Sequence, residues 1–468
     1  MGFGGLYISI SGLQASKYSL NTVSHNISNA NNLNYVRQSA MHTNNSYTRS
    51  ADGRLEMGTG VHVSQIRQIR DEFLDAKVRR EMPSFGYHYA RAQILEDVEG
   101  VFNEVTNSGL QKTMDGMWNN WNELFKESES LTMRGLVHES SVAFANSVNH
   151  ISNQLNDIKQ NINKQIYSKV DEVNSTLDQI AKINKGIKII EGADAKIRAN
   201  DYRDERNALI DRLSELLPIT SYENSFGESV ISLNGQDLVN GSYISKIDIQ
   251  ADENGQGYIY WENSNDKIDL KGKGELGGFI DARDISMVEY VGRLDELVGT
   301  MAGKLNELHK LGTDLLGEPG IDFFLGTGGV ITAANIKVNP ELADLNKIAV
   351  SGSGEKGDGE IAKKIYGIRD EKLFGKVGAE DKNLDEFYND LILTLGLERE
   401  EAISSADNQG FLIRSIDEKR KGLSAVSLDE EMADMIKFQH SYSANSRVIN
   451  ALDEMIETIV NRLGIVGR

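Results

Sequence analysis

The chain has 468 residues, and its 70 acidic and 50 basic side chains give a formal net charge of −20. This charge argues against nucleic acid and anionic membranes as partners, because both attract clustered Lys and Arg. The sequence contains no cysteine, which excludes disulfides, thiol catalysis and cysteine-ligated metals. It has no apolar run of about eighteen residues and no positively charged n-region, so we expect neither a membrane span nor a cleaved signal peptide.

The first 50 residues are predicted to form a helix followed by an extended segment. Leucine and isoleucine recur in residues 1–50 at intervals of seven, which is the repeat of a coiled-coil seam. The positions of this N-terminal stripe are Leu6, Ile10, Leu13, Leu20 and Ile27.

Uncharged amides flank this stripe in the stretch NTVSHNISNANNLN, residues 21–34. Asparagine is a poor residue inside a helix but a good residue at its end. We therefore expect Asn21 and Asn26 to make polar contacts between neighbouring helices without burying a charge. The asparagines between 31 and 34 are expected to end the helix.

Residues 51–217 are predicted to be the first part of a long-helix bundle, with a helical stretch at 87–125. From Phe144 to Ile190, apolar residues recur at steps of three and four, which marks one face of a helix. At about 1.5 Å per residue this helix is roughly 70 Å long. It therefore needs partner helices, and its stripe is interpreted as a packing seam.

Residues 218–272 are predicted to form a small inserted antiparallel β domain. Two β-rich runs, Ser229–Leu233 and Gly257–Trp261, lie in this interval. Asparagine–glycine pairs favour tight hairpin turns. These pairs are Asn234-Gly235, Asn240-Gly241 and Asn254-Gly255.

The rest of the body alternates helical and irregular segments. Residues 273–316 and 384–427 are predicted to be bundle helices, and 317–383 an irregular, glycine-rich region. Residues 428–468 form the C-terminal axial helix, whose two heptad series suggest that it pairs with the N-terminal helix. These positions are Leu428, Met435, Tyr442, Ile449, Ile456 and Leu463, and Phe438, Leu452 and Ile459. The predicted fold is thus mainly α, a long-helix bundle with paired terminal coiled-coil helices and the small β domain.

The sequence has no motif that predicts a catalytic, cofactor or metal site. Its eight histidines are scattered without ligand spacing, and the glycines lack the context of a phosphate loop. Acidic residues are abundant, so a pair of glycosidase carboxylates is not excluded, but no pair stands out.

Two terminal blocks resemble bacterial flagellar axial proteins. Residues 11–38, SGLQASKYSLNTVSHNISNANNLNYVRQ, are similar to the N-terminal signature of that family, and residues 427–460 to its C-terminal helix. Both blocks are shared by rod, hook and junction proteins. The long helices at 137–192, NDYRDERNALIDRLSELLPI at 200–219 and GELGGFIDARD at 274–284 resemble the hook-associated protein 1 family. One departure is Asn32-Leu33-Asn34, where the family usually has a Thr-Pro-Gly turn, and Asn34 is expected to supply the left-handed backbone.

The resemblance implies a structural protein without cofactors that joins flagellar hook to filament and assembles through its terminal helices. The partners it implies are other copies of the chain in a ring, the hook protein, the second junction protein and an export chaperone for the C-terminal helix. It also implies extracellular localisation in the flagellum after type III export. The alternatives are a hook or distal-rod protein and, from another class, a cell-wall-cleaving enzyme carried on the axial structure.

Overall fold

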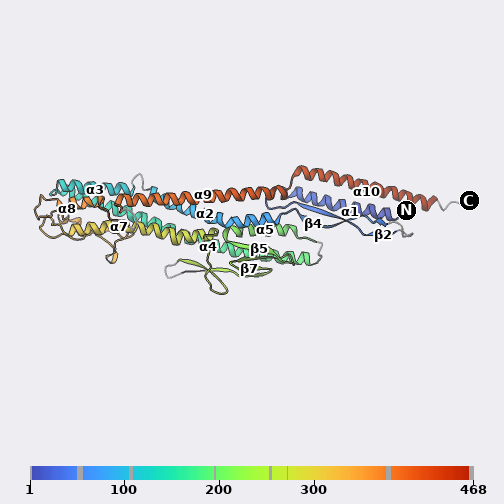
Figure 1. Ribbon diagram of the computed structural model, residues 1–468, viewed down its shortest axis with the longest axis horizontal. Coiled ribbons are helices and arrows are strands. Elements are labelled where there is room, and N and C mark those ends of the chain that lie inside the picture. Colours follow the sequence, from blue (N-terminus) through green and yellow to red (C-terminus); the bar gives the residue numbers. More distant parts are fainter. Residues whose placement is uncertain are drawn as a thin grey trace.

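The computed structural model describes an elongated molecule (Figure 1). A bundle of long helices forms the body, and two terminal helices extend beyond one end of it, where both chain termini lie. This arrangement confirms the predicted mainly α fold with paired terminal helices. The residues described are 3–49, 56–104, 109–193, 197–251, 256–270, 272–375 and 381–462.

The longest helix of the described chain is α4, Leu131–Ala193, with 63 residues. It buries one continuous stripe, which includes Phe144, Val148, Ile151 and Leu155. The stripe belongs to the main hydrophobic core, where α4 contacts α3 (Leu110–Lys126) and α5 (Asn200–Leu216). The predicted long helix and its packing role are confirmed.

Helix α2, Glu72–Glu104, pairs with α9, Leu384–Ser424, along the body. The stretch predicted to be helical at 87–125 contains the C-terminal part of α2 and nearly all of α3. Helix α2 also begins earlier than expected and continues through Pro83. Contacts of α2 with neighbouring elements, such as the ion pair from Arg79 to Asp211 at 2.7 Å, offset the lost backbone hydrogen bond.

The next helical segment contains α6, Gly274–Asp281, a π-helical turn at Ala282–Ser286, and α7, Met287–Lys310. Helix α6 packs very closely on α2. A Cβ built on Gly278 would lie 2.6 Å from the carbonyl oxygen of Tyr87. Only glycine allows this approach, so the residue type sets the distance between the two backbones.

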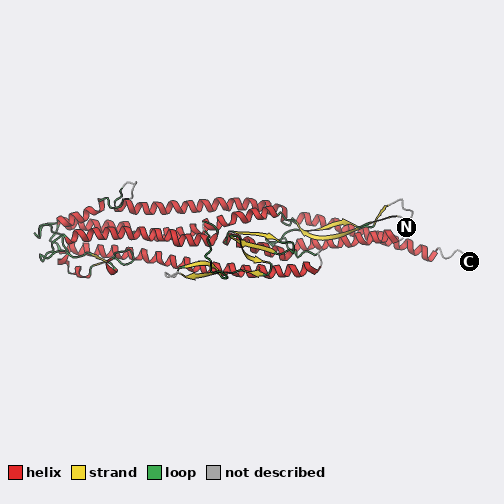
Figure 2. Cartoon of the chain, turned by 60° about the horizontal axis from the view of Figure 1, so that its bottom comes forward, coloured by secondary structure: helices red, strands yellow, loops and turns green. Residues whose placement is uncertain are grey.

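The predicted β-rich interval forms a four-stranded antiparallel sheet and a separate hairpin. The sheet has the order β5 (Ile219–Glu223), β6 (Ser229–Leu233), β7 (Gln236–Asn240) and β8 (Tyr243–Ile244), and β9 (Ile247–Ala251) pairs with β10 (Gly257–Trp261). Two strands match the predicted runs, and Asn234-Gly235 turns with φ of 52° and 86°. Asn254-Gly255 lies outside the described residues. Apolar residues of both units join the same core as α4, so the strands pack directly on the bundle (Figure 2).

The region predicted to be irregular contains a short helix, α8 (Glu360–Gly367), and the two-stranded pair β11 (Phe324–Leu325) and β12 (Lys337–Val338). Helix α8 was not predicted. It has only eight residues, and its burial of Ile361, Ala362 and Ile365 stabilises it more than its local sequence does.

The N-terminal region comprises α1 (Phe3–Ser28), β1 (Gln38–Asn44), β2 (Tyr47–Arg49), β3 (Glu56–Gly58) and β4 (Val61–Gln68), and it meets α10 (Leu428–Arg462). Strands β1 and β4 pair antiparallel and lie against α1. Thus β3 and β4 fall in an interval predicted to be helical. Among the described residues no helix is both long and apolar enough to span a membrane.

Candidate assembly site

The terminal helices α1 and α10 run antiparallel and contact each other along their length (Figure 1). At the end of the helix pair that is farther from the body, a Cβ built on Gly5 would lie 3.4 Å from Leu452. A Cβ built on Gly12 would lie 2.8 Å from the side-chain amide of Asn445. The α1 backbone therefore comes close to α10 at these two glycines.

The next level of this seam is aromatic and polar. Ser19 is 1% exposed, and its hydroxyl lies 2.9 Å from Nε2 of His42 on β1. The His42 ring stacks on Phe438 of α10, with ring centroids 6.2 Å apart. Strand β1 therefore fills the space that the small Ser19 side chain leaves between the helices.

The level closest to the body contains a buried carboxylate. Asn26 is 1% exposed, and its amide nitrogen donates to Gln38 O and to Glu431 Oε2, both at 2.9 Å. Its amide oxygen accepts from the Tyr35 hydroxyl at 2.7 Å. Glu431 is also 1% exposed and accepts from Arg37 Nε at 2.6 Å. The four levels are seven residues apart on each helix: Gly5, Gly12, Ser19 and Asn26 on α1, and Leu452, Asn445, Phe438 and Glu431 on α10.

The N-terminal stripe predicted to pair with α10 is displaced from this seam. Its members Leu6, Leu13, Leu20 and Ile27 follow the seam positions by one residue and are half-buried, while Ile10 and Asn21 are exposed. The contacts to α10 described above come from Gly5, Gly12 and Asn26, which give no hydropathy signal. The sequence signal that could have found them is the same seven-residue spacing from Gly5 to Asn26.

The C-terminal positions divide between the seam and the outer surface. Met435, Phe438, Ile449, Leu452 and Ile456 are half-buried. Leu428, Tyr442 and Ile459 are exposed, and Leu463 lies outside the described residues. The structure contains a single chain. The contact of these residues with other subunits therefore stays a prediction.

Two expectations about the asparagines are wrong. Asn26 does not avoid a charge, because it contacts the buried carboxylate of Glu431 inside its own chain. Asn34 has no positive φ, since Asn234 and Asn265 are the non-glycine residues with positive φ in the described part of the chain. The helix ends at Ser28, before the asparagines between 31 and 34 that are expected to end it, and the following turn is closed by the Asn34 N–H, which donates to Asn32 Oδ1 at 3.1 Å.

The outer surface of the terminal pair carries many large apolar side chains. Each is between 36% and 69% exposed. Large apolar side chains that stay exposed on one part of a molecule favour an interaction site there. Its members are Tyr7, Ile8, Ile10 and Tyr18 on α1, and Leu428, Met432, Ile436, Tyr442, Val448, Met455, Ile459 and Val460 on α10. We call this set the outer apolar face.

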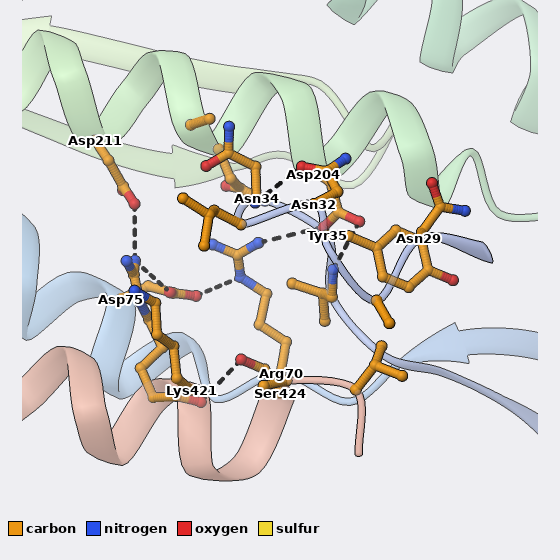
Figure 3. A pocket seen from close by; sticks show the side chains of 18 residues that line it. Asn29, Asn32, Asn34, Tyr35, Arg70, Asp75, Asp204, Asp211, Lys421 and Ser424 are labelled. Carbon is orange, nitrogen blue, oxygen red and sulfur yellow. Dashed lines mark hydrogen bonds and ion pairs between the residues drawn. The ribbon is translucent and has the colours of Figure 1, made fainter. Parts of the chain in front are cut away.

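A polar network joins the terminal pair to the body (Figure 3). Asp204 of α5 is 6% exposed, and its carboxylate accepts from Val36 N at 3.1 Å and from Gln68 Nε2 at 2.6 Å. Burial raises the pKa of Asp204 to about 7. The Arg37 N–H donates to Ser424 O at 2.8 Å, at the end of α9. The cavity drawn in Figure 3, about 180 Å³, lies among these segments.

These contacts position two helices and leave an apolar surface uncovered. Within the described residues no cluster of three or more His, Asp or Glu side chains could hold a metal ion.

Comparisons with known proteins agree with this geometry. Residues 95–324 match the family model of the flagellar hook-associated protein FlgK helical domain, and residues 423–463 match that of the flagellar basal body rod FlgEFG protein C-terminal region. Flagellar hook-associated protein 1 of Bacillus subtilis is 32% identical across 100% of this chain and 99% of that relative. The Escherichia coli protein of that name is 22% identical across 97% and 98%.

A solved structure shares the fold. The flagellar hook junction protein FlgK from Burkholderia pseudomallei matches with a TM-score of 0.64 and 13% identity, covering 75% of this chain and 100% of that one. The full-length similarity to the Bacillus subtilis relative confirms the predicted family and its structural, non-enzymatic role. The chain belongs to the flagellar hook-associated protein 1 family and is a structural component of the flagellum.

Proposed function

We propose that this chain is the adaptor between hook and filament, and that copies assemble into a ring through the outer apolar face of α1 and α10. The exposure of this face supports the proposal. Fully burying one large apolar side chain contributes about 1.5–3 kcal/mol. Twelve such side chains provide enough free energy to exceed the cost of association, which is about 4–15 kcal/mol.

The terminal segments 1–50 and 428–468 form the assembly unit of this proposal. The segments 51–217, 273–316 and 384–427 form the body, with 218–272 and 317–383 at its surface. Hook protein adjoins the ring on one side and the second junction protein on the other. The chain is exported through the flagellar type III pathway without signal cleavage, and an export chaperone covers α10 until then.

The test replaces part of the outer apolar face. Met455→Gln with Ile459→Gln changes two side chains that are 59% and 56% exposed. Thermal unfolding of the purified chain should stay unchanged, because these side chains lose little burial. Cells that carry only this variant should release filament protein into the medium.

The control is His440→Gln with Arg447→Gln, two exposed polar positions of α10 at a heptad position that no member of the outer apolar face occupies. It should leave filament attachment intact. Normal attachment in the Met455 and Ile459 double variant would contradict the proposal. A melting temperature lowered by several degrees would instead place these side chains in the interior of the subunit.

A further inference from the structure

A cavity lined by six arginines lies on the flank of the body, next to the junction with the terminal pair. It has a volume of about 650 Å³ and is bounded by the end of β4, the start of α2, α5 and β5. Three carboxylates also line it, and Glu191 and Asp211, which do not line it, pair with three of its arginines. The arginines are Arg67, Arg70, Arg79, Arg198, Arg203 and Arg206, and we call the site the arginine cavity.

Carboxylates of the body hold most of these guanidinium groups in place. Arg203 Nε lies 3.0 Å from Glu191 Oε1 and Arg70 Nε lies 2.5 Å from Asp75 Oδ2. Arg198 Nη1 is 3.1 Å from Glu191 Oε2 and is still 43% exposed. The donors are therefore ordered before any ligand arrives, which lowers the entropy cost of binding.

Two arginines have guanidinium groups that the described residues do not fully engage. Arg67 is exposed, and no carboxylate in the described part of the chain lies within ion-pair distance of it. Arg206 is 2% exposed and uses its two Nη groups on Asn184, Gly227 and Glu223. Its Nε is buried and has no acceptor among the described residues. Buried donors without an acceptor are rare in folded proteins.

A carboxylate is the ligand that suits these donors, because the planar guanidinium fork binds carboxylates through paired hydrogen bonds. We propose that the arginine cavity receives an acidic side chain from a second copy of this chain in the assembled ring. The inference rests on the proposed function. Copies with a charge of −20 repel each other, and Arg67 at the edge of this cavity offers a neighbour's carboxylate a positive charge that no carboxylate of the described residues pairs.

Charge reversal at the exposed edge of the cavity tests the site. Arg67→Glu should increase the filament protein released into the medium at least about tenfold, with unchanged thermal unfolding of the purified chain. Arg67→Lys, which keeps the charge but lacks the planar fork, should release less filament protein than Arg67→Glu and more than the unaltered chain. The matched control is Arg80→Glu, the same reversal at an exposed position of α2 outside the cavity, and it should have no effect.

A photo-reactive phenylalanine analogue placed at position 67 identifies the occupant. In assembled flagella it should cross-link two copies of this chain, with the second attachment in a peptide that contains Asp or Glu. Equal release by both reversals would overturn the inference, as would cross-links from position 67 only to another flagellar protein, or none, while filaments stay attached. Filaments that never attach with the unaltered chain would overturn the proposed function as well.

Discussion

The buried carboxylate of Glu431 should determine whether α10 stays paired with α1. Its side chain is 1% exposed and accepts from Arg37 Nε at 2.6 Å and from Asn26 Nδ2 at 2.9 Å. The neighbouring Glu430 accepts from Arg37 Nη1 at 2.8 Å but is 64% exposed. The two glutamates share one arginine and differ in burial, so each provides the control for the other.

Glu431→Ala removes two hydrogen bonds to a buried charge, each worth about 1.5–3 kcal/mol. Arg37 keeps Glu430 and reaches water at 20% exposure, which offsets part of the loss. We expect opening of the terminal pair to become easier by about 3 kcal/mol. Glu430→Ala should cost less than about 1 kcal/mol, as exposed pairs do. Alanine changes helix propensity equally at both positions, so that effect cancels.

Hydrogen exchange of the purified chain measures the difference. A loss of about 3 kcal/mol corresponds to amide exchange in α10 about a hundredfold faster. Exchange in α4 should stay unchanged, because α4 lies in the body. Equal acceleration by both substitutions, or acceleration in α4 but not in α10, would refute the assignment of Glu431 as the residue that anchors the helix pair.

Two further predictions concern the body. Gly278→Ala should lower the free energy of unfolding by about 2 kcal/mol, because its Cβ would meet the carbonyl oxygen of Tyr87, which cannot move away. A Cβ built on Gly292 would have no heavy atom within 4 Å, so Gly292→Ala should raise the free energy of unfolding by up to about 1 kcal/mol. Chemical denaturation of both variants would show whether one substitution destabilises the protein and the other stabilises it. Burial lowers the pKa of His309 to about 4, so its contribution to stability is present above the unfolded pKa near 6.5 and is lost as pH falls towards 4. This loss amounts to about 3 kcal/mol. Denaturant titrations from pH 7 to 4 should show that the free energy of unfolding falls less steeply with pH in His309→Gln than in the unaltered chain. An equally steep fall in both proteins would contradict this role of His309.

Periodic patterns predicted the long elements well. Helix α4 and strands β6 and β10 appear where apolar residues recur with the period of a helix or a strand. Elements that tertiary contacts stabilise were missed. Helix α8 is short and flanked by glycine-rich sequence, and α2, which packs against α9, α6 and α5, continues through Pro83.

The candidate site was predicted only in part. Phe438 and Leu452 lie in the seam, as their heptad spacing indicated. The α1 side of the seam consists of small and polar residues, and no hydropathy pattern marks them. The contact between Asn26 and Glu431 joins residues 405 positions apart, and no local pattern carries such information.

A rotating flagellum transmits torque, and Arg37 lies where that load would cross from the terminal pair to the body. Its backbone N–H holds the last turn of α9, and its guanidinium group holds the first turn of α10. One residue therefore connects the two helices on either side of the break at Ala425–Ser427. Under twist, this connection would resist rotation of one helix against the other, so Arg37 and its carboxylate partners would add to the stiffness that the contacts of Asp204 with Val36 and Gln68 give each subunit.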